Sequence, residues 1–169
     1  MPQAAVNGIT IEFEEYGSGD PLLLVMGLGG QLTDWPPELI EHLVAAGFRV
    51  IAPDNRDIGH STEMSGEGLA RSALVKAMLG RPVKSPYSLG DMASDAVGVL
   101  DHLGIDRAHV VGMSMGGMIA QELAIGWPEA VSSLTSIMSH TGDKRHGLID
   151  PKLAVKVARL GDPDPSDPA

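Results

Sequence analysis

The run Leu-Leu-Leu-Val-Met at residues 22–26 constrains the fold of this chain more than any other part of the sequence. Every residue in the run is apolar, so a strand formed there has two apolar faces, and both need cover. Helices on both sides of a mostly parallel sheet supply such cover. The run therefore predicts a central parallel strand, and this strand leads into the loop Gly27-Leu28-Gly29-Gly30.

The patterns around this strand alternate between strand and helix. Residues 9–16 alternate apolar and polar side chains, as an antiparallel edge strand with one solvated face does. Further apolar strands are predicted at 48–52, 108–112 and 131–138, and helices at 39–44, 88–103 and about 115–125. This alternation is typical of an α/β fold, in which right-handed crossovers connect the strands of a mostly parallel sheet.

Two segments depart from the alternation. Residues 55–86 form a connection longer than a crossover needs, with a weak helical pattern at 69–79, and we expect it to shape a site. We interpret residues 1–140 as the core and residues 141–169 as the start of a cap and a linker. In the latter, a helix is predicted at 153–160, and the proline-rich stretch 161–169 is predicted to be irregular.

Composition excludes several classes of function. The net charge of −10 disfavours nucleic acid and anionic membranes as partners. The absence of cysteine excludes a thiolate zinc site and a cysteine nucleophile, and the aspartates at 161–169 do not fit a calcium loop, so neither metal nor cofactor is predicted. No signal peptide and no apolar run of bilayer length is evident, which predicts a cytoplasmic protein.

The motif Gly112-Met113-Ser114-Met115-Gly116 lies where an apolar strand meets a helix. Glycines on either side let a strained turn close around a serine whose hydroxyl projects above the sheet, so Ser114 is predicted to be a nucleophile. The backbone N–H of Met115, at the start of the helix, is predicted to stabilise a developing oxyanion. The alternative interpretation is that Ser114 only caps the helix.

A second oxyanion donor is predicted in the loop 27–30. The backbone N–H of Leu28 is the expected donor, because the glycines beside it let a substrate carbonyl approach the main chain. The alternative is that these glycines serve only a tight turn. His60 is interpreted as a structural residue of a turn.

Three stretches together resemble the α/β-hydrolase superfamily: Val-Met-Gly-Leu-Gly-Gly at 25–30, Asp-Asn-Arg-Asp-Ile-Gly-His-Ser at 54–61, and Val-Gly-Met-Ser-Met-Gly-Gly at 111–117. The pattern is closest to the aclacinomycin methylesterase-like esterases and extends from about residue 5 through the chain. The resemblance implies a three-layer α/β-hydrolase sheet, mostly parallel with an antiparallel N-terminal edge. It also implies hydrolysis of carboxylic esters through an acyl-enzyme at Ser114, with a small-molecule ester as substrate.

The resemblance also implies a catalytic acid and a catalytic histidine, and no residue of this sequence matches either position. In the family the catalytic acid follows the seventh strand and the histidine follows the eighth, whereas this chain is expected to end after about the sixth strand. Asp143 is the alternative acid, and His140 or His146 the alternative base. We expect a complementary C-terminal chain, a homo-oligomer or the remainder of a longer native protein to cover the open edge of the sheet. The other functions considered are another acyl transfer on the same fold, such as perhydrolysis, and a catalytically inactive module that binds a small ligand or a partner.

Overall fold

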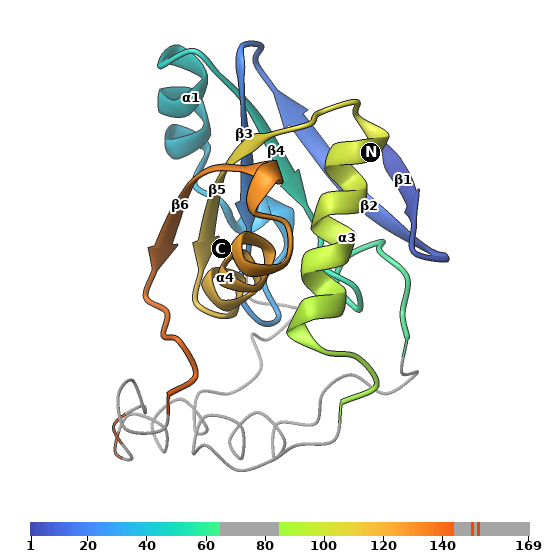
Figure 1. The fold of residues 1–169 in the computed structure, drawn as a ribbon. Coiled ribbons are helices and arrows are strands. Elements are labelled where there is room, and N and C mark those ends of the chain that lie inside the picture. The colour runs from blue at the N-terminus through green and yellow to red at the C-terminus, as the bar shows by residue number, and fades with distance from the viewer. Residues whose placement is uncertain (65–84, 144–149, 151, 153–169) are drawn as a thin grey trace, which may run out of the picture. The chain divides into compact units, whose positions relative to one another are not determined.

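A computed structural model describes residues 1–64, 85–143, 150 and 152 (Figure 1). The chain divides into two compact units, one made of residues 1–66 and 86–141 and the other of residues 67–85 and 142–169. The strands and helices described below belong to the first unit. The helices predicted at 69–79 and 153–160, and the irregular stretch predicted at 161–169, lie outside the described residues.

The first unit contains a six-stranded sheet in the order β1-β2-β4-β3-β5-β6. The strands are β1 (Gln3–Val6), β2 (Ile9–Tyr16), β3 (Asp20–Val25), β4 (Phe48–Pro53), β5 (Ala108–Met113) and β6 (Val131–Ile137). β1 pairs antiparallel with β2, and β2 antiparallel with β4, whereas β4, β3, β5 and β6 run parallel. The predicted fold class, a mostly parallel sheet with an antiparallel N-terminal edge, is confirmed.

The strand β1 is an element that the sequence patterns did not predict. It forms a hairpin with β2 through the two-residue turn Asn7-Gly8, which lies between the paired residues Val6 and Ile9. Asn7 has φ 50° and Gly8 φ 79°, as a tight turn that matches the twist of the strands requires. The Asn-Gly pair was therefore the available signal for this hairpin.

Three α-helices agree with the predicted positions: α1 (Pro37–Ala45), α3 (Leu89–His102) and α4 (Met115–Gly126). α3 begins with a capping box, in which the Ser88 side chain accepts from the Asp91 N–H and the Asp91 side chain accepts from the Ser88 N–H. Two short 3-10 helices, η1 (Leu32–Asp34) and η2 (Pro128–Ala130), follow β3 and α4.

The central strand β3 is buried on both faces, as its apolar sequence predicts. Leu23 and Val25 belong to the hydrophobic core formed with α3 and α4. Leu22 and Leu24 belong to a second core that contains Ile40 of α1. Since alternate residues of a strand face opposite sides of the sheet, α1 covers one face and α3 and α4 cover the other (Figure 1).

β6 forms the edge of the sheet opposite to β1 (Figure 1). Six of its seven residues are exposed, in agreement with the open edge expected at this apolar strand. The strand itself is confirmed, and the exposure arises because, among the described residues, β6 pairs only with β5.

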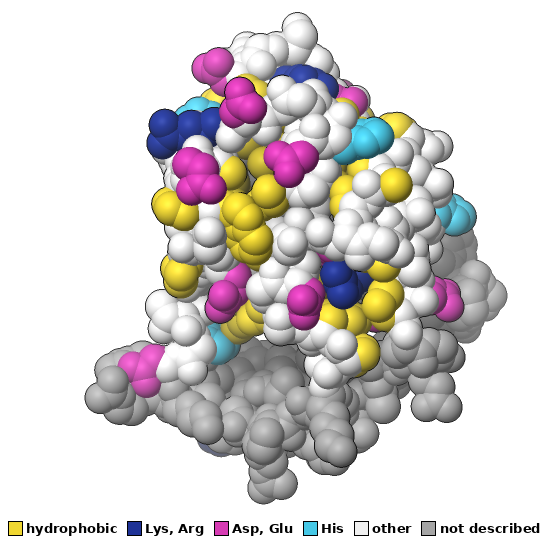
Figure 2. Space-filling view, turned by 45° about the vertical axis from the view of Figure 1, so that its right-hand side comes forward, with side chains coloured by type: hydrophobic (Ala, Val, Ile, Leu, Met, Phe, Trp, Pro, Cys, Tyr) yellow, Lys and Arg dark blue, Asp and Glu magenta, His cyan; other side chains and the backbone are white. Residues whose placement is uncertain are grey.

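The charges of the chain are scattered over the surface in view. On the face shown in Figure 2, Lys and Arg side chains occur in small separate patches with acidic side chains nearby. In the part of the chain that the structure describes, no helix has the length and apolar character needed to cross a membrane.

Candidate active site

Ser114 lies at the turn between β5 and α4, with φ 56° and ψ −119°. A positive φ is unfavourable for a residue with a side chain, and such strained residues cluster at functional sites. Ser114 is exposed, and its hydroxyl makes no hydrogen bond within the described residues. It occupies the N-cap position of α4 without accepting a capping bond, so the interpretation of Ser114 as a mere helix cap is wrong.

Steric contacts explain the glycines on either side of Ser114. A Cβ atom on Gly112 would lie 2.2 Å from the carbonyl oxygen of Gly116, and one on Gly116 would lie 2.0 Å from the carbonyl oxygen of Val25. Both distances are far shorter than a van der Waals contact. The two glycines therefore let the turn close and let the start of α4 pack against β3.

Neighbouring backbone holds the turn in place. The N–H of Ser114 donates to the carbonyl of Ile137 at the end of β6, at 2.8 Å. The carbonyl of Ser114 accepts from the N–H of Gly117, at 3.0 Å. The strained conformation is thus supported by hydrogen bonds on both sides of Ser114.

The glycine-rich loop after β3 reaches the same place. A Cβ atom on Gly27 would lie 3.2 Å from Cβ of Ser114 and 3.7 Å from its Oγ. Gly27 begins a tight turn, because its carbonyl accepts from the N–H of Gly30 at 3.3 Å and Gly29 has φ 75°. The structure therefore brings the predicted oxyanion loop next to the predicted nucleophile.

The N–H groups of Leu28 and Met115 have no intramolecular acceptor among the described residues. Leu28 follows directly on Gly27, and Met115 is the first residue of α4, where backbone donors are free and the helix dipole favours negative charge. Both N–H groups are therefore available to an oxygen bound beside Ser114. Their role as an oxyanion hole remains a prediction.

Sequence reasoning did not single out two residues that hold this loop, Asp54 and Asn55. Asp54 Oδ1 accepts from the N–H of Leu32 at 2.6 Å, and Asn55 Nδ2 donates to the carbonyl of Met26 at 3.0 Å. The partners lie 22 and 29 residues apart in the chain, so no local sequence pattern indicates these contacts. Burial raises the pKa of Asp54, against the lowering effect of the Leu32 hydrogen bond.

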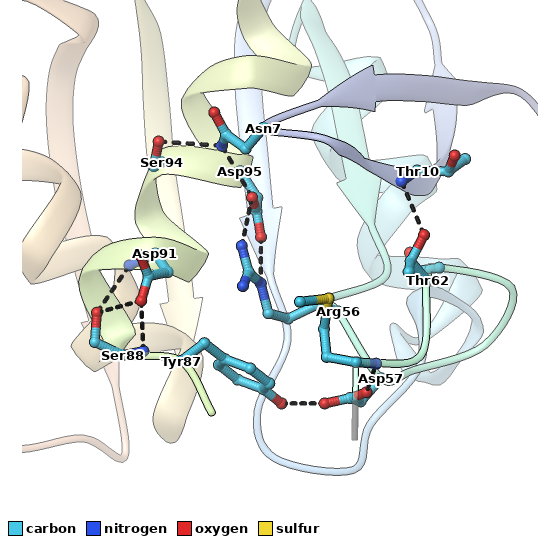
Figure 3. Close-up of polar contacts among 12 residues, drawn as sticks. Asn7, Thr10, Arg56, Asp57, Thr62, Tyr87, Ser88, Asp91, Ser94 and Asp95 are labelled. Atoms are coloured by element: carbon cyan, nitrogen blue, oxygen red, sulfur yellow. Dashed lines mark hydrogen bonds and ion pairs between the residues drawn. The ribbon is translucent and has the colours of Figure 1, made fainter. Parts of the chain in front are cut away.

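A polar network lies beyond this pair (Figure 3). Arg56 makes two hydrogen bonds to Asp95 of α3, at 2.7 and 2.8 Å, and its guanidinium lies 4.9 Å from the centroid of the Tyr87 ring. Burial lowers the pKa of Arg56, but the bonds to Asp95 outweigh it and raise the pKa above its usual value. Asn7 donates to Asp95 at 2.9 Å, so the network connects the β1–β2 turn to α3.

The carboxylate of Asp57 accepts hydrogen bonds from two residues farther along the chain. It accepts from the N–H of Met64 at 2.5 Å and from the hydroxyl of Tyr87 at 2.5 Å, and Figure 3 shows the contact with Tyr87. These two residues stand on either side of residues 65–84, which lie outside the description. His60, interpreted from the sequence as structural, is exposed in the adjacent turn, and its backbone N–H donates to Glu12 at 3.3 Å.

Ser114 Oγ forms no hydrogen bond with the alternative acid or bases among the described residues. His140 follows β6, and its carbonyl accepts from Gln121 of α4 at 3.4 Å. Asp143 belongs to the second compact unit, and His146 lies outside the described residues. Their assignment stays a prediction. Within the described ranges, no group of three or more metal-ligating side chains could hold a metal ion.

A serine on a strained strand-to-helix turn, above a mostly parallel sheet covered by helices, is the arrangement that α/β-hydrolases share. The model of the α/β hydrolase fold family matches residues 20–164 of this chain. The chain therefore belongs to the α/β hydrolase fold family.

The chain is also similar to individual members of this family. A rhodomycin D methylesterase of Streptomyces peucetius is 34% identical over 98% of this chain and 50% of its own length. A 2-hydroxymuconate semialdehyde hydrolase of Pseudomonas is 36% identical over 75% of this chain and 39% of its own length. The crystal structure of an enol-lactonase of Burkholderia xenovorans superposes with a TM-score of 0.64, at 27% identity, over 82% of this chain and 46% of the lactonase. The chain spans about half the length of the curated relatives it matches.

Proposed function

We propose that this chain carries the nucleophile and the oxyanion hole of a serine hydrolase that cleaves carboxylic esters of small molecules. The observation that carries the proposal is the exposed, strained and uncapped Ser114 with the backbone of Gly27 beside it. The family membership supports a hydrolase. The similar proteins include a methylesterase and an enol-lactonase, and both names denote the cleavage of an ester bond.

In this mechanism Ser114 Oγ attacks the ester carbonyl carbon while a base removes the hydroxyl proton. The carbonyl oxygen becomes an oxyanion, which accepts hydrogen bonds from the N–H groups of Leu28 and Met115. The tetrahedral intermediate collapses, the C–O bond to the alcohol breaks, and the alcohol leaves with the proton. Water then attacks the acyl-enzyme by the same route and releases the acid and free Ser114.

The base is a histidine oriented by a carboxylate, because a serine hydroxyl is a poor nucleophile on its own. Among the described residues no imidazole forms a hydrogen bond with Ser114. We place the histidine and the acid on a segment that continues the sheet beyond β6, in a complementary C-terminal chain. Asp143, with His140 or His146, is the alternative source.

A fluorophosphonate probe tests the nucleophile, because it reacts covalently with activated serines. We expect the wild-type chain, supplied with the complementary segment, to be labelled and to hydrolyse p-nitrophenyl esters. Ser114→Ala removes both properties. Ser18→Ala, at an exposed serine between β2 and β3, is the matched control and retains both. Turnover by Ser114→Ala at the wild-type rate contradicts the proposal.

The second candidate is a catalytically inactive module that binds a small ligand above Ser114. The observation in its favour is the free hydroxyl of Ser114, which has no base within the described residues. Ligand binding without labelling by the probe, even after addition of the complementary segment, supports this candidate over the enzyme.

The exposed edge strand β6 is the proposed place of association. Its sequence, Val-Ser-Ser-Leu-Thr-Ser-Ile, contains no charge and no proline, the features that protect natural edge strands from pairing. We expect a complementary chain or a second copy to pair there. Gel filtration with intact-mass analysis should show association, and Thr135→Lys should weaken it. A concentration-independent monomer of 17.7 kDa contradicts this expectation.

A further inference from the structure

We infer that Asp54 and Asn55 are positioning residues that hold the oxyanion loop against Ser114; this inference rests on the proposed function. The loop begins at Met26, passes Gly27 and Leu28, and ends at Leu32. Asn55 holds its first residue through the Met26 carbonyl, and Asp54 holds its last through the Leu32 N–H. Two consecutive residues thus fix both ends of the loop that carries the Leu28 donor.

Both side chains are buried, with exposed fractions of 3% for Asp54 and 8% for Asn55. Water therefore competes little for these hydrogen bonds, and a bond lost there leaves an unsatisfied buried group. The loop between the two anchors contains three glycines, whose backbone has wide conformational freedom. Without the anchors, both ends of the loop are free to shift, and the N–H of Leu28 shifts with them.

Asp54 is itself held in place by its neighbours. The backbone of Asp54 donates to the carbonyl of Glu12 at 2.9 Å and accepts from the hydroxyl of Ser61 at 2.8 Å. Gly59 packs so closely that a Cβ atom there would lie 1.9 Å from Asp54 Oδ2. The carboxylate is thereby enclosed and directed toward Leu32. β4 and the turn after it form a fixed support for the loop after β3.

Catalysis depends on this support, because an oxyanion donor acts only within about 3 Å of the developing charge. A displacement of about 1 Å reduces turnover on the order of a hundredfold. Loss of an anchor therefore affects kcat more than KM, since Leu28 contacts the oxyanion in the transition state.

Two variants of similar shape separate the hydrogen bond from packing. Asp54→Asn keeps an oxygen that accepts from Leu32, whereas Asp54→Leu removes it. In the protein that hydrolyses p-nitrophenyl esters, we expect Asp54→Leu to lower kcat at least about tenfold with KM within about twofold. Asp54→Asn should restore kcat to within about threefold of wild type. Asn55→Asp, which loses the donor to Met26, should lower kcat as Asp54→Leu does, and it is the second test if Asp54→Leu does not fold.

Amide hydrogen exchange of the full chain, measured by NMR, provides the readout that does not depend on activity. The Leu32 amide should exchange at least about tenfold faster in Asp54→Leu than in wild type or Asp54→Asn. Wild-type exchange at Leu32 in Asp54→Leu overturns the inference, and so does equal loss of kcat in Asp54→Asn and Asp54→Leu. If wild type shows no ester turnover and no labelling of Ser114, the proposed function fails, while exchange at Leu32 alone still decides whether Asp54 holds the loop.

Discussion

The Cα atom of Gly27 lies against the side chain of Ser114, although 87 residues separate them in the chain. A methyl group on Gly27 would stand 3.2 Å from Cβ of Ser114 and 3.2 Å from the carbonyl oxygen of Met113. The loop after β3 can therefore approach the turn after β5 this closely because residue 27 is a glycine and has no side chain.

Gly27→Ala should thus disturb the site without unfolding the protein. The added methyl group requires a shift of a few tenths of an ångström between the loop and Ser114, and we expect labelling by a fluorophosphonate probe to slow at least about tenfold. Gly90→Ala in α3 is the control, because its methyl group would lie 3.5 Å from Ser88 Oγ, an ordinary van der Waals distance. Equal labelling rates for the two variants would show that Ser114 tolerates the shift.

Gly116→Ala should act on stability. Its methyl group would lie 2.0 Å from the carbonyl oxygen of Val25, so α4 must move away from β3, at a cost of about 3 kcal/mol in the free energy of unfolding. Gly126→Ala, at the other end of the same helix, has open space around the new methyl group and should change stability by less than about 1 kcal/mol. Urea denaturation of both variants measures the difference, and similar midpoints would contradict the close packing at Gly116.

The Arg56–Asp95 pair should contribute far more to stability than the exposed pair Arg49–Glu15. The side chains of Arg56 and Asp95 are 8% and 6% exposed, and Asp95→Asn leaves a buried guanidinium without its counterion, at about 3–5 kcal/mol. Both side chains of the Arg49–Glu15 pair are 31% exposed, so Glu15→Gln should cost at most about 1 kcal/mol. Thermal unfolding of the two variants under the same conditions tests this contrast.

Asp54 should make stability depend on pH. Its pKa in the folded protein is raised from the usual 3.8, chiefly by burial, so the folded state binds a proton more tightly than the unfolded state. The contribution of Asp54 to stability is therefore full below the unfolded pKa and is lost as the pH rises through the folded pKa. Relative to Asp54→Asn, the wild type should lose stability as the pH rises above 3.8. Urea denaturation of both proteins between about pH 4 and 7 measures the difference, and a constant difference would exclude a raised pKa.

Much of the fold is evident in local sequence patterns. The fully apolar run before Gly27 predicts a strand buried on both faces, and β3 lies between the two cores. The Ser88–Asp91 box marks the start of α3. The motif also predicts the position of Ser114, because the strained turn requires glycines on both sides and both are visible in the sequence.

The tertiary structure alone decided which distant groups meet. The sheet order places β4 and β5 on either side of β3, so the ends of all three strands lie together, and the order cannot be derived from the spacing of residues along the chain. For this reason the contacts of Asp54 and Asn55 with the oxyanion loop were not predicted, whereas the open edge of the sheet at β6 was. Local propensity and periodicity determine the elements, whereas burial of their shared surfaces determines the neighbours of each residue.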